Sequence, residues 1–367
     1  MQDARRRDGT APIMRQQTPS VGALQRTMAA TILITGASGL IGFRILLAAL
    51  AAGYNVRYTV RSEEKAQAVS SNPAVQKLKP TGDRFRPIIV PDFSADGAFD
   101  SALQGVTHII HAGSPVPFPT YDPTTEVFQP TIKITSGLLS SALKAPSVQR
   151  VIITSSIVSN LGLIPPPNTV SASTRAPLPS PVPSTFSDVF EGYITGKMVE
   201  LHNTDGFVKN ERPHFTVSHV IPGYVFGRNE LALDAAMMQT QNSSNNFLMM
   251  GMLGGELPFP IHGGFVHIDD LADLHLRILF LEPKAGEIED FGVSTKVDYG
   301  TIFDYVEKTF PKAVEAGVFK RGKVPTLPVN YMSSDVEKLL GRKLRTFDEA
   351  VVDVAGQYLE KLGKEKA

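Results

Sequence analysis

Residues 35–42 read TGASGLIG, and they join the apolar run TILI to the apolar stretch FRILLAALAAG. Three glycines, Gly36, Gly39 and Gly42, recur at a spacing of three where a short β-branched run gives way to a helix-like segment. An ordinary glycine-rich turn would have this composition, and so would a backbone that approaches an anionic ligand. The rest of the sequence has to decide between the two.

From residue 30 onward, short β-branched runs alternate with segments that are long enough for helices. Such alternation predicts a parallel sheet with helices on both faces. One helix is expected from Leu40 to Ala52, where Gly53 stops it. The expected strands are residues 31–35, 55–60, 86–91, 107–112, 150–156 and 215–222.

The sequence predicts three parts of the chain. Residues 1–29 are Arg-rich without apolar periodicity, so we expect a disordered N-terminal extension; Asp3 and Asp8 count against a mitochondrial presequence. Residues 30–225 are expected to form the main α/β domain, and residues 226–367 a smaller mixed lobe. The seven prolines of residues 165–183 exclude helix and inner strand, so a long loop is expected over residues 165–185.

Composition excludes several classes of function. The 36 basic residues balance the 36 acidic ones, so nothing points to nucleic acid or to an anionic membrane as a partner. Cysteine is absent, which excludes thiolate catalysis, and the eight histidines lack metal-ligand spacing, so no metal is expected. No apolar run approaches the roughly 20 residues of a membrane span. We expect a cytoplasmic globular protein, monomeric or weakly dimeric, that acts on a small molecule.

The glycine stretch gains meaning from this context, because it follows the first strand of a parallel pattern and opens a helix. Gly36 would permit a tight turn, Gly39 would let a pyrophosphate approach the backbone, and Gly42 would allow close packing of helix and strand. The N–H groups at the helix N-terminus attract phosphate. The sequence therefore predicts a dinucleotide-binding turn, with cofactor contacts from Gly36, Ser38, Gly39, Leu40, Ile41 and Gly42.

The end of the second expected strand bears on the choice between NAD and NADP. NAD-binding proteins usually place an acidic residue there to accept from the ribose hydroxyls. Here the strand ends at Arg61, and Lys65 lies one helical turn further on. A guanidinium matches a 2′-phosphate, so NADP(H) is the predicted cofactor. A solvated charge at a strand end is the simpler alternative, and Glu63 and Glu64 lie close by.

The segment YITGK places Tyr193 and Lys197 four residues apart, on one face of a helix if residues 189–203 are helical. Ser156 stands at the carboxyl end of the fifth expected strand, where open parallel sheets carry their chemistry. Tyrosine ordinarily has a pKa of about 10. A neighbouring ammonium and an oxidised nicotinamide would lower that pKa. Tyr193 would then protonate a carbonyl oxygen during hydride transfer, while Lys197 holds the ribose and Ser156 hydrogen-bonds to the substrate.

These residues resemble the extended short-chain dehydrogenase/reductases, which have a Rossmann fold, a doubly wound parallel sheet, with a smaller C-terminal substrate lobe. Finer features resemble the branch that holds dihydroflavonol 4-reductase, cinnamoyl-CoA reductase and fungal methylglyoxal-type aldehyde/ketone reductases. They are TVRS (59–62), PDF (91–93), HAGSP (111–115), IPGYVFG (221–227) and FVHIDDLADLHL (265–276).

The resemblance implies an NADPH-dependent aldehyde or ketone reductase with Ser156, Tyr193 and Lys197 as the catalytic residues. Ser155 and Ser159 are rivals for the serine. It also implies that Arg61 and Lys65 hold the 2′-phosphate. The further cofactor residues that it implies are Asp92, Phe93, Ala112, Gly113, Ser114, Pro222, Gly223 and Val225.

Other functions remain open. An NAD-dependent epimerase or dehydratase and a 3β-hydroxysteroid dehydrogenase would use the same scaffold, and a non-enzymatic NADP-sensing regulator is a further alternative. The segment HIDDLADLHL is interpreted as a helix start with Asp269 near its N-cap rather than as a metal site. The methionines at 237, 238, 249, 250 and 252 would line a substrate pocket or fill the core. His111 is interpreted as a packed strand residue.

Overall fold

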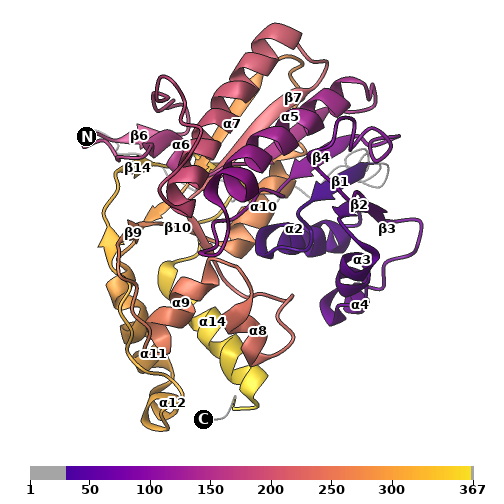
Figure 1. Ribbon diagram of the computed structural model, residues 1–367. Helices are drawn as coiled ribbons and strands as arrows, with labels where there is room; N and C mark the ends of the chain where they lie inside the picture. Colours follow the sequence, from indigo (N-terminus) through magenta and orange to yellow (C-terminus); the bar gives the residue numbers. More distant parts are fainter. Residues whose placement is uncertain (1–29, 365–367) are drawn as a thin grey trace, which may run out of the picture.

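The computed structural model describes residues 30–364, so the expected N-terminal extension lies outside the described residues. Its centre is a parallel sheet of seven strands in the order β11-β7-β5-β4-β1-β2-β3 (Figure 1). The strands are β1 (Thr31–Thr35), β2 (Asn55–Val60), β3 (Phe85–Ile89), β4 (His108–His111), β5 (Arg150–Thr154), β7 (Thr216–Pro222) and β11 (Ile288–Val293). All six expected strands are confirmed, with ends that move by a few residues. The seventh, β11, was not predicted.

Successive side chains of the inner strands point to opposite faces of the sheet, and both sets are apolar, which explains why helices cover both faces. On β1, Ile32 and Ile34 pack into one apolar cluster while Leu33 packs into another. The first cluster includes α2 (Leu40–Ala51) and α10 (Ile268–Ile278), and the second includes α5 (Gln129–Leu143) and the end of α7 (Val189–Glu211). Strands that are buried on both sides read as continuous β-branched runs, which is the pattern that predicted the parallel sheet.

Shorter elements complete the first part of the chain. Helices α3 (Glu63–Ser70) and α4 (Pro73–Leu78) follow β2, and a π-helical turn, Pro123–Phe128, precedes α5. The short α6 (Val158–Leu161) follows β5. The expected proline-rich loop contains only the two-residue strand β6 (Val170–Ser171), which pairs with β14 (Tyr331–Met332). Arg175 ties this loop to the fold through ion pairs with Asp205 of α7 and Asp290 of β11.

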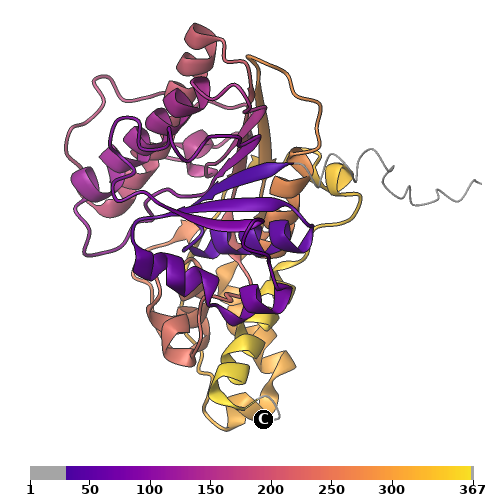
Figure 2. The same ribbon diagram turned by 90° about the vertical axis from the view of Figure 1, so that its right-hand side faces the viewer.

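The C-terminal segments gather below the sheet in the view of Figure 2. Their core joins Phe226, Phe265, Tyr299 and Phe347, whose rings pack with centroids about 5–6 Å apart. The helices are α8 (Ala235–Thr240), α9 (Asn245–Met252), α11 (Ile302–Thr309), α12 (Pro311–Glu315) and α14 (Phe347–Leu362). Helix α13 (Val336–Leu340) instead packs against α10 and β11. The strands are β8 (Tyr224–Phe226), β9 (Ile261–His262), β10 (Gly264–His267), β12 (Thr295–Lys296) and β13 (Thr326–Leu327).

The two parts of the chain are interleaved. Strand β11 comes from beyond residue 225 yet pairs with β7, and α10 packs against α2 (Figure 1). The division at residue 225 therefore stays a proposal, because β11, α10 and α13 come after this residue but belong to the sheet domain in space. No helix of residues 30–364 is long and apolar enough to cross a membrane.

Candidate active site

The predicted site residues come together because the sheet is parallel. Strands β1, β4, β5 and β7 are paired in register, with Thr35 opposite His111 and Thr154 opposite Val220. Their carboxyl ends therefore meet at one edge, the edge at which open α/β sheets bind ligands. Each predicted site residue outside α7 follows one of these strand ends or the ends of β2 and β3. This edge is the candidate active site.

The glycine turn has the geometry that its sequence predicts. Gly36 has φ +75°, and a Cβ there would lie 2.6 Å from the carbonyl oxygen of Ala112. A Cβ on Gly42 would lie 2.2 Å from the carbonyl oxygen of Gly36. Ser38 and Gly39 are exposed, and Leu40 and Ile41 are half-buried. The turn is thus built from backbone packed on backbone, with its tip and helix N-terminus open to a ligand.

The loop after β4 lies against this turn. A Cβ on Gly113 would lie 2.8 Å from the backbone nitrogen of Gly36, so only glycine fits at both positions. The hydroxyl oxygen of Ser114 is buried and has no hydrogen-bond partner among residues 30–364. A buried polar group without a partner is costly. A dinucleotide in this cradle would supply the missing partner, so the residues present fit such a cofactor.

The outer end of the site holds the residues expected at the adenosine. Arg61 and Lys65 are exposed at the end of β2 and the start of α3, and no ion pair within residues 30–364 involves either of them. Ser62 caps α3 by accepting from the backbone nitrogen of Lys65. Asp92 accepts from the backbone nitrogen of Ser94 at 2.8 Å, and Phe93 stacks on Phe99. Two cations therefore stand free beside the place predicted for a 2′-phosphate.

On the other side of the turn, the chain after β7 is tightly packed. Pro222, Gly223 and Val225 are buried. A Cβ on Gly223 would lie 2.5 Å from the backbone of Gly264, which explains glycine at this position. The carbonyl oxygen of Pro222 accepts from the backbone nitrogen of Ile157 at 3.0 Å, joining this segment to the serines after β5.

Helix α7 brings Tyr193 and Lys197 to the edge, and its helical structure is confirmed. Asp188 caps the helix by accepting from the backbone nitrogens of Phe190 and Glu191. Lys197 is buried, and its Nζ donates to the carbonyl oxygen of Thr154 at 3.3 Å, at the end of β5. One helical face therefore holds the phenol and the ammonium against the strand that carries the serine.

The pKa of Tyr193 corrects one expectation. Burial raises this pKa above its ordinary value, and the charge of Lys197 and the nearby hydroxyl of Ser156 lower it only in part. The expected neighbours are present and act in the expected direction, but desolvation of the phenolate outweighs them. In the protein without a bound nucleotide the phenol is therefore protonated at neutral pH.

The three serines after β5 differ in their surroundings. Ser155 and Ser159 are buried, and their hydroxyls lie 3.4 Å apart; Ser159 also donates to the carbonyl oxygen of Ser156 at 2.7 Å. Ser156 is half-buried and is the serine that faces Tyr193. This placement favours Ser156 over its two rivals.

Sequence reasoning missed Glu200, one turn beyond Lys197 on α7. It is buried, and its Oε2 accepts from Nζ of Lys197 at 2.7 Å. The signal available in the sequence was a carboxylate three residues after the lysine on the same helical face. His111 is buried in β4 with hydrogen bonds from both ring nitrogens, as expected of a packed strand residue.

The remaining motifs are structural. His267 caps α10 by accepting from the backbone nitrogen of Asp269, and fully buried Asp270 pairs with Arg342 and Arg345. No group of metal-ligating side chains occurs in the described part of the chain. Met238, Met249 and Met252 are buried in the core of the C-terminal segments, and Met237 and Met250 are partly buried against it.

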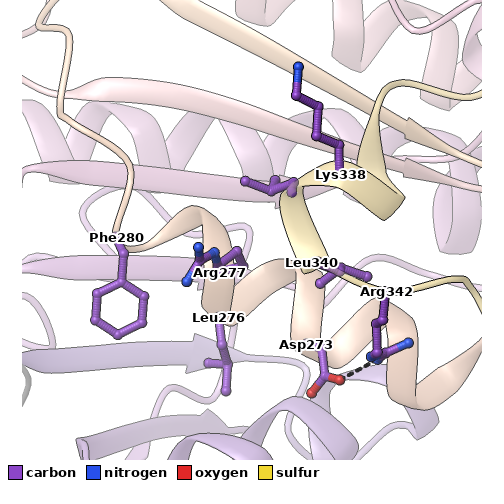
Figure 3. A pocket seen from close by; sticks show the side chains of 9 residues that line it. Asp273, Leu276, Arg277, Phe280, Lys338, Leu340 and Arg342 are labelled. Atoms are coloured by element: carbon purple, nitrogen blue, oxygen red, sulfur yellow. Dashed lines mark hydrogen bonds and ion pairs between the residues drawn. The ribbon is translucent and has the colours of Figure 1, made fainter. Parts of the chain in front are cut away.

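A separate open cavity of about 370 Å³ lies between α10 and α13 (Figure 3). Its walls include Leu276, Phe280 and Leu340, and the ion pair between Asp273 and Arg342 crosses one side. None of its lining residues is a predicted site residue, so this cavity is distinct from the candidate active site.

The fold and this edge define an α/β protein of the dinucleotide-binding type. Residues 32–182 match the NAD dependent epimerase/dehydratase family. The chain is 34% identical to the "Ketoreductase CTB6" of Cercospora beticola, over 90% of this chain and 95% of that one. It is 35% identical to the "NAD-dependent epimerase/dehydratase ALT6" of Alternaria alternata, over 87% and 95%.

Among solved structures, the chain is similar to yeast methylglyoxal/isovaleraldehyde reductase Gre2 complexed with NADPH. The TM-score is 0.75 and the identity 25%, over 91% of this chain and 99% of that one. This chain belongs to the NAD-dependent epimerase/dehydratase family of extended short-chain dehydrogenase/reductases. Membership and these relatives support an NAD(P)-dependent oxidoreductase, as the sequence predicted.

Proposed function

We propose that this protein is an NADPH-dependent reductase that transfers hydride to an aldehyde or ketone. The observation that carries the proposal is the meeting of Ser156, Tyr193 and Lys197 at the edge that also holds the glycine turn. The names of CTB6, a ketoreductase, and of Gre2, an aldehyde reductase bound to NADPH, support the same reaction.

The residues of the edge would hold the cofactor along its length. The glycine turn and the N-terminus of α2 would take the pyrophosphate, Arg61 and Lys65 the 2′-phosphate, and Ser114 a polar group near the middle. When bound, NADPH supplies the hydride. The absence of an acidic residue at the end of β2 supports NADPH over NADH.

The side chains at the centre handle the proton. Tyr193 is protonated at neutral pH because burial raises its pKa, so it can donate its proton to a carbonyl oxygen that gains negative charge. Ser156 would donate a hydrogen bond to the same oxygen and stabilise that charge. The ammonium of Lys197 favours the phenolate that remains, because its charge lowers the pKa of Tyr193.

The first alternative is an epimerase or dehydratase, and the name of ALT6 favours it. Such enzymes keep NAD bound through the catalytic cycle, whereas a reductase releases its oxidised cofactor. An ultraviolet spectrum of the purified protein separates the two, because retained nucleotide absorbs near 260 nm. Release of nucleotide on simple dialysis supports the reductase.

The proposal is tested by NADPH oxidation with a panel of aldehydes and ketones. Wild-type protein is expected to consume NADPH with at least one member, and Tyr193→Phe to lose this activity by a factor of roughly 10² or more while binding NADPH normally. Phe190→Leu, one turn earlier on α7, is the control for packing. Normal turnover by Tyr193→Phe would refute the mechanism, and an inactive wild-type protein would point to the alternative.

A further inference from the structure

The ammonium of Lys197 is held by two buried partners. It donates to the carbonyl oxygen of Thr154 at 3.3 Å and to Oε2 of Glu200 at 2.7 Å, and both charged side chains are only 2% exposed. An ammonium has three N–H donors. One donor therefore remains for the open side of the site, where Tyr193 lies.

The second oxygen of Glu200 is also fixed. Oγ1 of Thr135, on α5, donates to Oε1 of Glu200 at 2.5 Å. The hydroxyl has one proton, and a charged carboxylate is the stronger acceptor, so this bond prevails over the carbonyl oxygen of Thr131 at 3.2 Å. Both carboxylate oxygens of Glu200 thus have a partner, as a buried charge requires.

His111 continues this contact into the sheet. Since the Thr135 proton points to Glu200, Nε2 of His111 must donate to Thr135 Oγ1, at 3.1 Å. Nδ1 then accepts from Oγ1 of Thr35, at 2.6 Å. Burial lowers the pKa of His111 to about 4, so the ring is neutral and one tautomer satisfies both bonds.

The last bond reaches the cofactor cradle. The backbone nitrogen of Gly113 donates to Oγ1 of Thr35 at 3.2 Å, and Gly113 packs directly on Gly36. These contacts form one hydrogen-bonded network in which each donor and acceptor has a single assigned role. Its members, in the order of their contacts, are Gly113, Thr35, His111, Thr135, Glu200 and Lys197. It connects the glycine turn of β1 to the lysine of α7.

We propose that Glu200 is the positioning residue that fixes the Lys197 ammonium, and that Thr135 and His111 orient Glu200 from the cofactor cradle. The inference rests on the proposed function and adds to it a buried counter-ion outside the predicted trio. Glu200 is 2% exposed and both of its carboxylate oxygens accept from protein groups, so it would act through Lys197 rather than on a ligand.

Removing the charge of Glu200 should shift the alkaline limb of the pH–activity profile in one direction only, to lower pH. The titratable groups next to Glu200 are Lys197 and Tyr193 on α7 and His111 on β4. Tyr224 on β8 lies beside Tyr193, and His275 bonds Thr154 at the end of β5. The charge of Glu200 is one of the causes that raise the pKa of Tyr193, so the phenol should ionise at lower pH when that charge is removed. This change moves the alkaline fall of carbonyl reduction to lower pH.

The test compares Glu200→Gln with wild type for kcat, KM, pH profile and NADPH affinity measured by nucleotide fluorescence. The glutamine variant should lower kcat by ~10- to 100-fold and move the alkaline limb down by about one pH unit or more, in activity and in NADPH binding. Exposed Glu211→Gln, on the same helix, is the control and should match wild type. Glu200→Asp should restore the alkaline limb but not the full kcat, because it keeps the charge and withdraws the oxygens.

A merely structural role for Glu200 would lower thermal stability without moving the alkaline limb, and that result overturns the inference. If Glu200→Gln does not fold, wild-type behaviour of Glu200→Asp in every measurement also overturns it. The two proposals fail separately. If Glu200→Gln shifts the pH dependence of NADPH binding but the wild-type protein reduces no carbonyl compound, only the proposed function is wrong. If the wild-type protein reduces carbonyl compounds and Glu200→Gln has the same alkaline limb as wild type, only this inference is wrong.

Discussion

Replacement of Gly42 by alanine tests whether the glycine turn is set by backbone packing. In a helix interior this change ordinarily stabilises a protein by up to about 1 kcal/mol. At Gly42 the new Cβ would lie 2.2 Å from the carbonyl oxygen of Gly36, and 3.0 Å from the backbone nitrogen of Ala37. Backbone atoms cannot rotate away, so helix and turn must separate.

The magnitude follows from these two opposing effects. Overpacking costs roughly 1–3 kcal/mol, and the contact with rigid backbone places Gly42→Ala at the upper end. After the helix gain is subtracted, we expect a net loss of about 2 kcal/mol, or a fall in Tm of roughly 3 °C. Gly206→Ala on α7 is the matched control, because nothing lies within 4 Å of the new Cβ; it should raise stability by up to about 1 kcal/mol.

The assay is thermal unfolding followed by circular dichroism, together with NADPH titration by nucleotide fluorescence. Gly42→Ala should lose both stability and NADPH affinity, since the displaced turn is the predicted pyrophosphate site. Gly206→Ala should change stability alone. If Gly42→Ala melts at or above the wild-type temperature and binds NADPH normally, the packing argument for the turn is wrong.

Three further predictions concern charge. Arg61→Ala should weaken NADPH binding by roughly tenfold or more and NADH binding hardly at all, measured by fluorescence titration; equal losses contradict the assignment of the 2′-phosphate. Carbonyl reduction should stay level from pH 7 to about pH 9 in a steady-state pH profile, because the raised pKa of Tyr193 keeps the acid protonated; a fall centred near pH 7 would contradict this. Arg175→Ala should lower the free energy of unfolding at neutral pH by about 2–3 kcal/mol, whereas Arg228→Ala, in an exposed pair with Glu360, should cost less than about 1 kcal/mol. Burial opposes ionisation of Asp290, but His219 and Arg175 outweigh burial and hold the pKa of Asp290 below its unfolded value. The stability lost in Arg175→Ala is therefore present at pH 7 and should shrink as pH falls below about 4, measured by urea unfolding.

Most of the sheet could be predicted because its signals are local. The six predicted strands are buried runs of β-branched residues, and Gly42 of the turn is dictated by a backbone contact with Gly36, six residues earlier in the chain. Strand β11, with the sequence IEDFGV, escaped prediction because its acidic residues Glu289 and Asp290 hide the apolar pattern. Those carboxylates are tolerated in the sheet because Arg150, Arg175 and His219 pair with them, from positions about 70 to 140 residues away in the chain.

The sequence by itself determined the parallel α/β architecture, the glycine turn at the end of β1 and the helical spacing of Tyr193 and Lys197, because each depends on neighbours along the chain. Only the tertiary structure decided that Ser156 is the serine facing Tyr193, that burial outweighs Lys197 in setting the phenol's pKa, and that Glu200 is the partner of Lys197. These outcomes depend on which groups are removed from water together. Residues 35, 111, 135 and 200 meet in one buried network only after two parallel strands and two helices have packed.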